Sequence, residues 1–370
     1  MKIAFFDRRS VFITERALIE KFILEVGLSD KFILKENVVE FESAVCQYIG
    51  AQDAIAVSSG TYGLIIGLAA LDVRPGVDVL TPTFSFVASA SAIAFRGATP
   101  VFVDVDPDTY TISPVSIIEK ITPNCRVVIP VHLFSALAKM DEINRVSKEY
   151  NLIVLEDSAV SFGSHIGSKF AGLLGDLGIY SFFPTKPLGG IGDGGMIVTN
   201  NKELGTRCRL LRNHGQDGKN RFLHHELGYN SRMDEILALY LNHRMKSVDI
   251  SIENRNKIAG YYNERLKPLE PRIKVPQLFD YNQVYYIYAI QADERDDLKK
   301  FLLERGIKTK EYFSTPLHLQ PAFEYLGYER GDFPIAEMLS RRILALPFYP
   351  TLSETDADKV IEAIYSFYGT

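Results

Sequence analysis

The chain has 370 residues, 46% of them hydrophobic, and a formal net charge of −5. This profile excludes an intrinsically disordered chain, and without a basic run it gives no reason to expect a nucleic-acid partner. The three cysteines, Cys46, Cys125 and Cys208, lie far apart, which argues against a disulfide framework or a metal site. No apolar stretch is long enough to predict a membrane span. We therefore expect a soluble protein in the reducing cytoplasm.

The first two thirds of the chain alternate between helical and strand-like patterns. Amphipathic spacing predicts a helix over 36–50 that ends at Gly50. "AIAVSSG" then indicates a short strand, and "TYGLIIGLAAL" indicates the helix that follows it. Further short, β-branched runs are typical of strands and fall at 77–84, 99–106, 125–134 and 151–159. This alternation predicts a mostly parallel sheet with helices on both faces.

The pattern changes after about residue 245. A polar helical segment, 233–266, leads into a smaller set of predicted elements. These are strands over 283–293, 307–313 and 341–349, and helices over 296–306 and 353–368, the last capped by Ser353. We expect a large domain over 1–250 and a small C-terminal α/β domain over 251–370.

One lysine stands in unusual surroundings. "SFFPTKPLGGIGDGG" (181–195) places Lys186 between two prolines, after two aromatic residues and before a glycine-rich run. The glycines satisfy G-x-G-x-x-G, but the strand-like "MIVTN" follows them where a dinucleotide site needs a helix. A desolvated lysine becomes a nucleophile that can hold an aldehyde cofactor. The alternative is a lysine whose stem packs on Phe182 or Phe183 while its amine reaches water.

Three predicted strand ends supply groups that suit such a cofactor. Asp157 ends "NLIVLED", where a buried carboxylate needs a cationic partner such as a pyridinium nitrogen. "SSGT" (58–61) opens a helix whose N-terminus suits a phosphate. Phe86 ends "TPTFSF" and offers a ring for stacking. Alone, each has an ordinary alternative: a turn or cap for Asp157 and Ser59, and a core position for Phe86. Together they match the requirements of pyridoxal phosphate.

These stretches also carry a family resemblance. Over nearly its whole length the chain resembles the DegT/DnrJ/StrS family of pyridoxal-phosphate-dependent sugar aminotransferases, which have the aspartate aminotransferase-like (type I) fold. The matching segments are collinear and include "SSGTYGLIIGLAAL", "VLTPTFSFVASASAI", "VLEDSA", "SFFPTKPLGGIGDGG", "GYNSRMDEI" and "TPLHLQPAFEYLGY".

The resemblance implies a role for each site residue. Lys186 would form the Schiff base with pyridoxal 5'-phosphate and move the substrate proton, and Asp157 would pair with the ring nitrogen. Phe86 would lie on the ring face. The cofactor phosphate would contact Ser59, Gly60, Thr61 and Ser181, and Asn230 of a neighbouring subunit. A homodimer with shared active sites follows. His318 would lie near the sugar-nucleotide entrance, although a structural loop histidine explains it equally well, and His132 is expected to be structural.

The implied reaction transfers an amino group from L-glutamate to a nucleotide-linked keto sugar in a ping-pong scheme. One departure complicates it: Val160 stands where the family commonly has a glutamine that hydrogen-bonds the cofactor ring oxygen, which valine cannot do. "VHLFSALAKM" also lacks the usual Gly-Gln after its aromatic residue. Two alternatives therefore stay open, namely a cofactor-binding family member with a regulatory role and an aminotransferase acting on a keto-cyclitol.

Overall fold

The main sheet of the molecule is mostly parallel, as predicted. The computed structural model describes residues 2–220 and 222–369, and within them this sheet has seven strands in the order β1-β9-β8-β5-β4-β2-β3. All neighbours from β8 to β3 are parallel, whereas β9 is antiparallel to both β1 and β8. The strands are β1 Asp53–Val57, β2 Asp78–Pro82, β3 Thr99–Val103, β4 Cys125–Val128, β5 Ile153–Asp157, β8 Leu177–Ser181 and β9 Gly195–Thr199.

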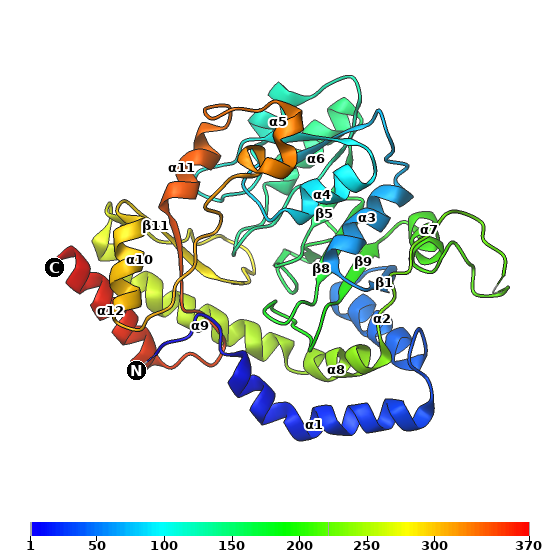
Figure 1. Cartoon of the computed structure of the whole chain (residues 1–370), viewed down its shortest axis with the longest axis horizontal. Helices are drawn as coiled ribbons and strands as arrows, with labels where there is room; N and C mark the ends of the chain where they lie inside the picture. The colour runs from blue at the N-terminus through cyan, green and yellow to red at the C-terminus, as the bar shows by residue number, and fades with distance from the viewer. Residues whose placement is uncertain (1, 221, 370) are drawn as a thin grey trace.

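Helices cover both faces of this sheet (Figure 1). Alternate residues of β1 show why: Ala54 and Ala56 join the apolar cluster beneath α2 and α8, while Ile55 and Val57 join the cluster beneath α3. The helices of this part are α2 Glu36–Ile49, α3 Gly60–Ala70, α4 Ala88–Phe95, α5 Pro114–Lys120, α6 Met140–Tyr150, α7 Lys202–Arg212 and α8 Glu235–Met245. Because strands β1 to β5 are buried on both sides, they have the near-continuous apolar sequences from which they were predicted.

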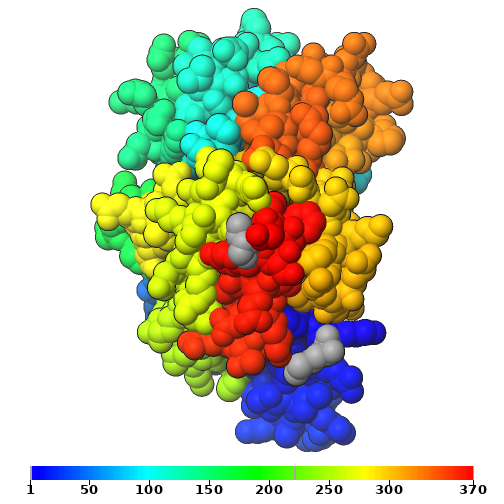
Figure 2. All heavy atoms as spheres, turned by 90° about the vertical axis from the view of Figure 1, so that its left-hand side faces the viewer, coloured from blue at the N-terminus to red at the C-terminus, as the bar shows by residue number. Residues whose placement is uncertain are grey.

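A second, smaller sheet has its own apolar core. Its strands β10 Ile273–Lys274, β11 Tyr288–Ala292 and β12 Ile343–Leu346 are antiparallel. The core is closed by α9 Val248–Leu266, α10 Arg295–Glu304 and α12 Glu354–Tyr368, and α12 packs across both other helices (Figure 2). The predicted boundary near residue 250 falls at the start of α9, and we keep it as a proposal.

The N-terminal segment joins this second core before it reaches the first. Ile3 is buried in the cluster of the small sheet and pairs with Ile307, and the Phe5 carbonyl accepts a hydrogen bond from the Phe348 amide. Helix α1 (Arg8–Ser29) then runs along the base of the molecule and packs on α8 through Ile19 and Phe22 (Figure 1).

Three predicted strands of the C-terminal part need correction. The strand predicted over 283–293 is shorter, because β11 begins only at Tyr288. Residues 307–313 form no strand; among the described residues they make only isolated pairings, Ile307 with Ile3 and Lys310 with Ala345. The predicted strand over 341–349 is shorter, since α11 (Pro334–Arg342) extends to its start. In the part of the chain that the structure describes, no helix is both long and apolar enough to span a membrane.

Candidate active site

The N-terminus of α3 meets the end of β8 at very short range. Ser59 caps the helix and accepts a hydrogen bond from the Tyr62 amide at 3.1 Å. A Cβ atom on Gly60 would lie 3.0 Å from the Ser181 Cβ atom, and one on Gly195 would lie 2.5 Å from the Ser59 carbonyl carbon. The absence of side chains at these glycines therefore brings Ser59, Gly60 and Ser181 together, next to Thr61. The first N–H groups of a helix at such a point form an anion site.

Asp157 ends β5 as a buried carboxyl. Its Oδ1 accepts a hydrogen bond from the Ala159 amide at 3.2 Å, and its backbone is fixed by Pro130 and His132. Burial raises the pKa of Asp157, against the opposing effects of that amide and of the Lys186 and His132 charges. A carboxyl in this state is stabilised as an anion when a cation is placed against it.

Lys186 follows β8 in a tight turn, in which its amide donates to the Phe183 carbonyl at 2.9 Å. Burial lowers the pKa of the Lys186 ammonium to about 8, and the negative charge of Asp157 opposes that shift. Asp157 is thus near enough for its charge to act on the Lys186 ammonium, and the joint role of the two groups in holding a cofactor stays a prediction. An amine with this pKa is partly neutral near physiological pH and is a competent nucleophile.

Tyr286 is a member of the site that the sequence did not indicate. The Lys186 Nζ lies 4.5 Å from the centroid of the Tyr286 ring, and the Tyr286 hydroxyl lies 3.0 Å from the Thr185 Oγ1. In the sequence, Tyr286 is one of several aromatic residues in "QVYYIYAIQAD" (283–293). That segment predicts a strand and indicates no role in the site. Its proximity to Lys186 depends on how residues 283–287 cross to the large sheet, which a local pattern does not encode.

Two other predicted residues are exposed on this chain. The Phe86 side chain, beyond β2, is 63% exposed, so its ring is accessible to a ligand or another subunit. Asn230 is also exposed, although Ser231 beside it is buried and its Oγ lies 2.9 Å from the Ser58 Oγ. The hydrogen bond between Ser231 and Ser58 ties the Asn230 segment to the same N-terminal end of α3.

The two singled-out histidines are both buried in hydrogen-bonding networks. The His318 Nδ1 lies 2.7 Å from the Thr83 Oγ1 and its Nε2 lies 3.2 Å from the Glu337 Oε1. These are the contacts of a structural histidine, and a substrate contact by His318 stays a prediction. The His132 Nδ1 accepts from the Ala138 amide at 3.0 Å, so its Nε2 carries the proton donated to Glu156 at 2.8 Å.

The donor set fits a planar aromatic cofactor with a phosphate and an aldehyde. The helix N-terminus at Gly60 provides an anion site, Asp157 provides a buried carboxyl without a cationic partner in direct contact among the described residues, and Lys186 provides the amine. Gly60 and Gly195 leave room for backbone N–H groups to approach an anion closely. No group of three or more metal-binding side chains occurs among the described residues.

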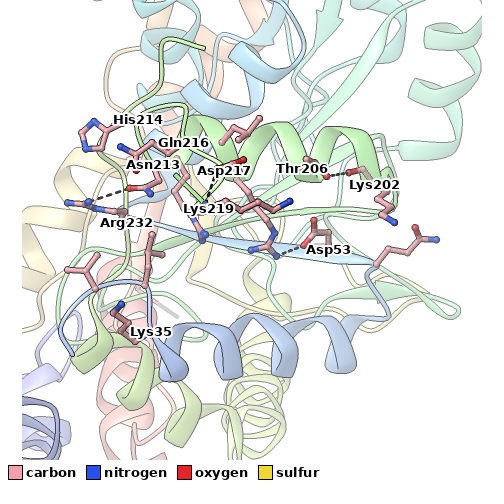
Figure 3. A pocket seen from close by; sticks show the side chains of 17 residues that line it. Lys35, Asp53, Lys202, Thr206, Asn213, His214, Gln216, Asp217, Lys219 and Arg232 are labelled. Atoms are coloured by element: carbon pink, nitrogen blue, oxygen red, sulfur yellow. Dashed lines mark hydrogen bonds and ion pairs between the residues drawn. The ribbon is translucent and has the colours of Figure 1, made fainter. Parts of the chain in front are cut away.

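A separate cavity lies beside α7 and contains none of these predicted residues (Figure 3). Its volume is about 1250 Å³, and Arg232 donates to the Asn213 Oδ1 at its wall. Two of its arginines, Arg209 and Arg212, are already paired with the Glu42 carboxylate. Neither Lys186 nor Asp157 lines this cavity, so it is separate from the candidate site.

Comparison with known proteins defines the class. The chain superimposes on S. venezuelae DesV, solved in complex with a ketimine intermediate, at a TM-score of 0.95 and 32% identity, covering 99% of this chain and 98% of that one. NtdA from Bacillus subtilis, solved with bound cofactor PMP, matches at a TM-score of 0.89 and 30% identity, over 96% and 82% of the two chains. These similarities confirm the predicted type I fold.

The sequence comparison agrees. A pleiotropic regulatory protein of Geobacillus stearothermophilus is 42% identical over 93% of this chain and 92% of its own length. The UDP-N-acetyl-3-dehydro-alpha-D-glucosamine 3-aminotransferase of Acidithiobacillus ferrooxidans is 37% identical over 90% of this chain and 89% of its own length. The DegT/DnrJ/EryC1/StrS aminotransferase family matches residues 14–365, and the chain belongs to this family. The predicted family and enzyme class are thus confirmed.

Proposed function

We propose that the protein is a pyridoxal-phosphate-dependent aminotransferase that moves an amino group from L-glutamate to a nucleotide-linked keto sugar. The observation that carries this proposal is that the buried Asp157 carboxyl ends β5 without a cationic partner in direct contact among the described residues, while Lys186, over the Tyr286 ring, has an amine whose pKa burial lowers to about 8. The family and the cofactor-bound relative NtdA support the choice of cofactor.

Each residue of the candidate site has its own proposed role. Bound pyridoxal phosphate supplies an electrophilic carbon and a ring that accepts electrons from the substrate carbon. Asp157 would hold a proton on the ring nitrogen through its buried negative charge. Ser59, Gly60, Thr61 and Ser181 would bind the phosphate and so fix the position of the ring. Lys186 would hold the cofactor, and its free amine would carry the proton to and from the substrate carbon.

The substrate class rests on the relatives. Several are named for amino sugars carried on UDP or dTDP, including a dTDP-3-amino-3,6-dideoxy-alpha-D-galactopyranose transaminase that is 36% identical over 98% of both chains. A nucleotide-linked keto sugar is the substrate that this shared chemistry favours. L-glutamate as donor is part of the same proposal.

The active form is proposed to be a homodimer. Asn230 is exposed on its own chain, and Phe222 and Leu227 before it are 87% and 97% exposed. Exposed apolar side chains that gather in one place mark interaction sites, and we take this segment as the proposed interface. A neighbouring subunit that covered them would receive Asn230 at its own phosphate site.

The test follows the two half-reactions separately. The protein carrying its cofactor is mixed with L-glutamate while the visible absorption band is recorded, and we expect that band to disappear as the cofactor takes up the amino group. Adding keto sugars linked to UDP, dTDP or GDP is then expected to restore it. Borohydride reduction followed by peptide mapping checks the anchor, which we expect at Lys186 and not in Lys186→Ala. A band that glutamate leaves unchanged, or a label on another lysine, contradicts the proposal.

The regulatory alternative has one observation in its favour. The 42% identical relative is named a pleiotropic regulatory protein, and Val160 is a buried apolar residue where a glutamine is common in the family. This alternative predicts that the cofactor binds and that neither half-reaction proceeds. The experiment with glutamate therefore separates the two functions directly.

A further inference from the structure

We infer that Tyr286 is a positioning residue for Lys186, with its ring face serving as the resting place of the free ammonium. The inference deepens the proposed function and rests on it for its biological meaning. During such a reaction the lysine leaves the cofactor and must stay close to the substrate carbon. A free lysine side chain has four flexible bonds, so an unrestrained amine would explore many positions.

The Tyr286 ring meets the geometric requirement for a cation–π contact. The Lys186 Nζ lies 4.5 Å from the ring centroid, inside the distance of about 6 Å at which an ammonium is attracted to the negative face of an aromatic ring. The contact lies in a partly desolvated site, where such attractions are strongest. The structure thus shows where the amine lies when it is not covalently engaged.

Tyr286 itself is fixed from three sides. Its amide donates to the Phe134 carbonyl at 2.9 Å, and its hydroxyl lies 3.0 Å from the Thr185 Oγ1. Its carbonyl accepts from the Arg255 guanidinium at 3.0 Å. Thr185 directly precedes Lys186 in the chain, so the hydroxyl contact couples the ring to the turn that carries the lysine.

Arg255 strengthens this reading because its hydrogen bonds go to backbone carbonyls, while its guanidinium lies over the Phe348 ring at 5.7 Å from the centroid. The residue is 4% exposed, and its NH1 group donates to the carbonyls of both Tyr285 and Tyr286. Among the ion pairs of the described residues, none involves Arg255. A buried guanidinium is costly, so its use to hold residues 285–286 indicates that their position matters.

Other charged groups around Lys186 must be considered in any pH experiment. The Asp157 carboxylate favours the ammonium, whereas burial disfavours it. Burial raises the pKa of the Tyr286 phenol, and that of its neighbour Tyr312, so both stay neutral over the range in which Lys186 titrates. Arg255 stays cationic there, because its pKa is lowered only to about 10. Lys186 is thus the group expected to change its charge near pH 8.

The test measures the titration of the Lys186 amine directly. Full-length protein, either without cofactor or with pyridoxamine phosphate, which cannot bond covalently to a lysine, is labelled with trace acetic anhydride from pH 6 to 11. The extent of labelling in the Lys186 peptide gives the midpoint. Because the ring favours the ammonium, Tyr286→Leu is expected to lower the midpoint by about one pH unit, which raises labelling several-fold at pH 7. Tyr286→Phe keeps the ring and is expected to keep the midpoint.

Two controls make the outcome specific. Phe313→Leu removes another aromatic residue nearby, whose ring packs on Phe134 and Tyr312, and is expected to leave the midpoint unchanged. Fluorinated phenylalanine at position 286 keeps the shape of the ring but weakens its negative face, so it is expected to lower the midpoint relative to Tyr286→Phe even if Tyr286→Leu does not fold. A fluorinated ring that leaves the midpoint at the Tyr286→Phe value, or an equal effect of Phe313→Leu, overturns the inference. Neither result depends on turnover, so failure here is distinct from failure of the proposed function.

Discussion

In the cofactor-free protein, the buried ammonium of Lys186 lowers the free energy of unfolding. Burial lowers the pKa of its ammonium to about 8, from an ordinary value of 10.5. Between these values the unfolded chain binds more protons than the folded one, so this lysine makes stability rise with pH across that window. Below about pH 8 the folded protein bears the full cost of a desolvated ammonium. That cost is part of what makes the amine reactive at neutral pH.

Lys186→Met is expected to remove this cost. At pH 7 the variant should be more stable than the parent by about 1–3 kcal/mol, and the gain should shrink as the pH rises towards 10.5. Urea unfolding of the cofactor-free full chain at pH 7 and pH 10 measures both values. Lys308→Met, at an exposed lysine, serves as the control and should change little at either pH. Equal stability of parent and Lys186→Met at pH 7 would contradict the assigned burial.

At the scale of elements, the glycine face of α3 sets how close the helix lies to the sheet. A Cβ atom on Gly63 would lie 2.7 Å from the Ile179 Cγ2 of β8. An alanine inside a helix normally stabilises by up to about 1 kcal/mol relative to glycine. At Gly63 the clash should dominate, and Gly63→Ala is expected to destabilise by about 1–3 kcal/mol. It should also weaken cofactor binding, because moving α3 moves Gly60 and Thr61.

The matched control lies in another helix. Gly260 is inside α9, and a Cβ atom there would meet nothing within 4 Å. Gly260→Ala is therefore expected to stabilise slightly, so the two identical changes should have opposite signs in thermal unfolding. A stabilising Gly63→Ala would show that α3 and β8 are not packed this closely.

Some elements of the fold could be predicted from the sequence pattern, and others could not. Helix α2 and its Gly50 terminus, and helix α3 with its Ser59 cap, were predictable because local chemistry determines where they begin and end. The predicted strand over 283–293 was too long, since β11 begins only at Tyr288. Its first part leaves the small sheet, and the Tyr286 amide pairs with Phe134 instead. Because this part of the chain leaves the small sheet, Tyr286 lies close to Lys186. The alternation of apolar residues in the sequence does not indicate where the chain leaves the sheet.

Some positions in the candidate site were likewise predictable from the sequence, and others were not. The places of Asp157 and of the segment 58–61 at strand ends were predictable, because such strand ends meet at one edge of the sheet, while their contacts with a cofactor stay predictions. Residues 307–313 alternate like a strand, yet their partners, Ile3 and Ala345, allow only isolated pairings. Which partner a strand-like segment finds depends on contacts distant in sequence, such as those made by the N-terminal residues.

At the scale of the whole molecule, the described surface carries apolar side chains that a lone chain leaves in water. Among them, the segment after α7 extends away from the body of the molecule and exposes Phe222 and Leu227 (Figure 1). Burying a side chain of this size is worth about 1.5–3 kcal/mol. Arg96 donates to the Tyr229 hydroxyl at 2.6 Å, so the base of this segment is attached to α4. A second subunit is the proposed cover for these side chains.

Replacing both exposed residues, Phe222→Asp with Leu227→Asp, is expected to produce a monomer, because two charges would have to be desolvated in the interface. Sedimentation velocity at micromolar concentration should show a dimer for the parent and a species near 41.6 kDa for the variant. Leu303→Asp, at a leucine that is 58% exposed on α10, tests whether any exposed leucine has this effect and should leave the dimer intact.

Since Asn230 is proposed to reach the neighbouring phosphate, the monomeric variant should also bind pyridoxal phosphate at least several-fold more weakly while keeping its thermal stability without cofactor. A parent protein that sediments as a monomer would refute the shared site, and Lys186 and Asp157 would then have to act with phosphate contacts from a single chain.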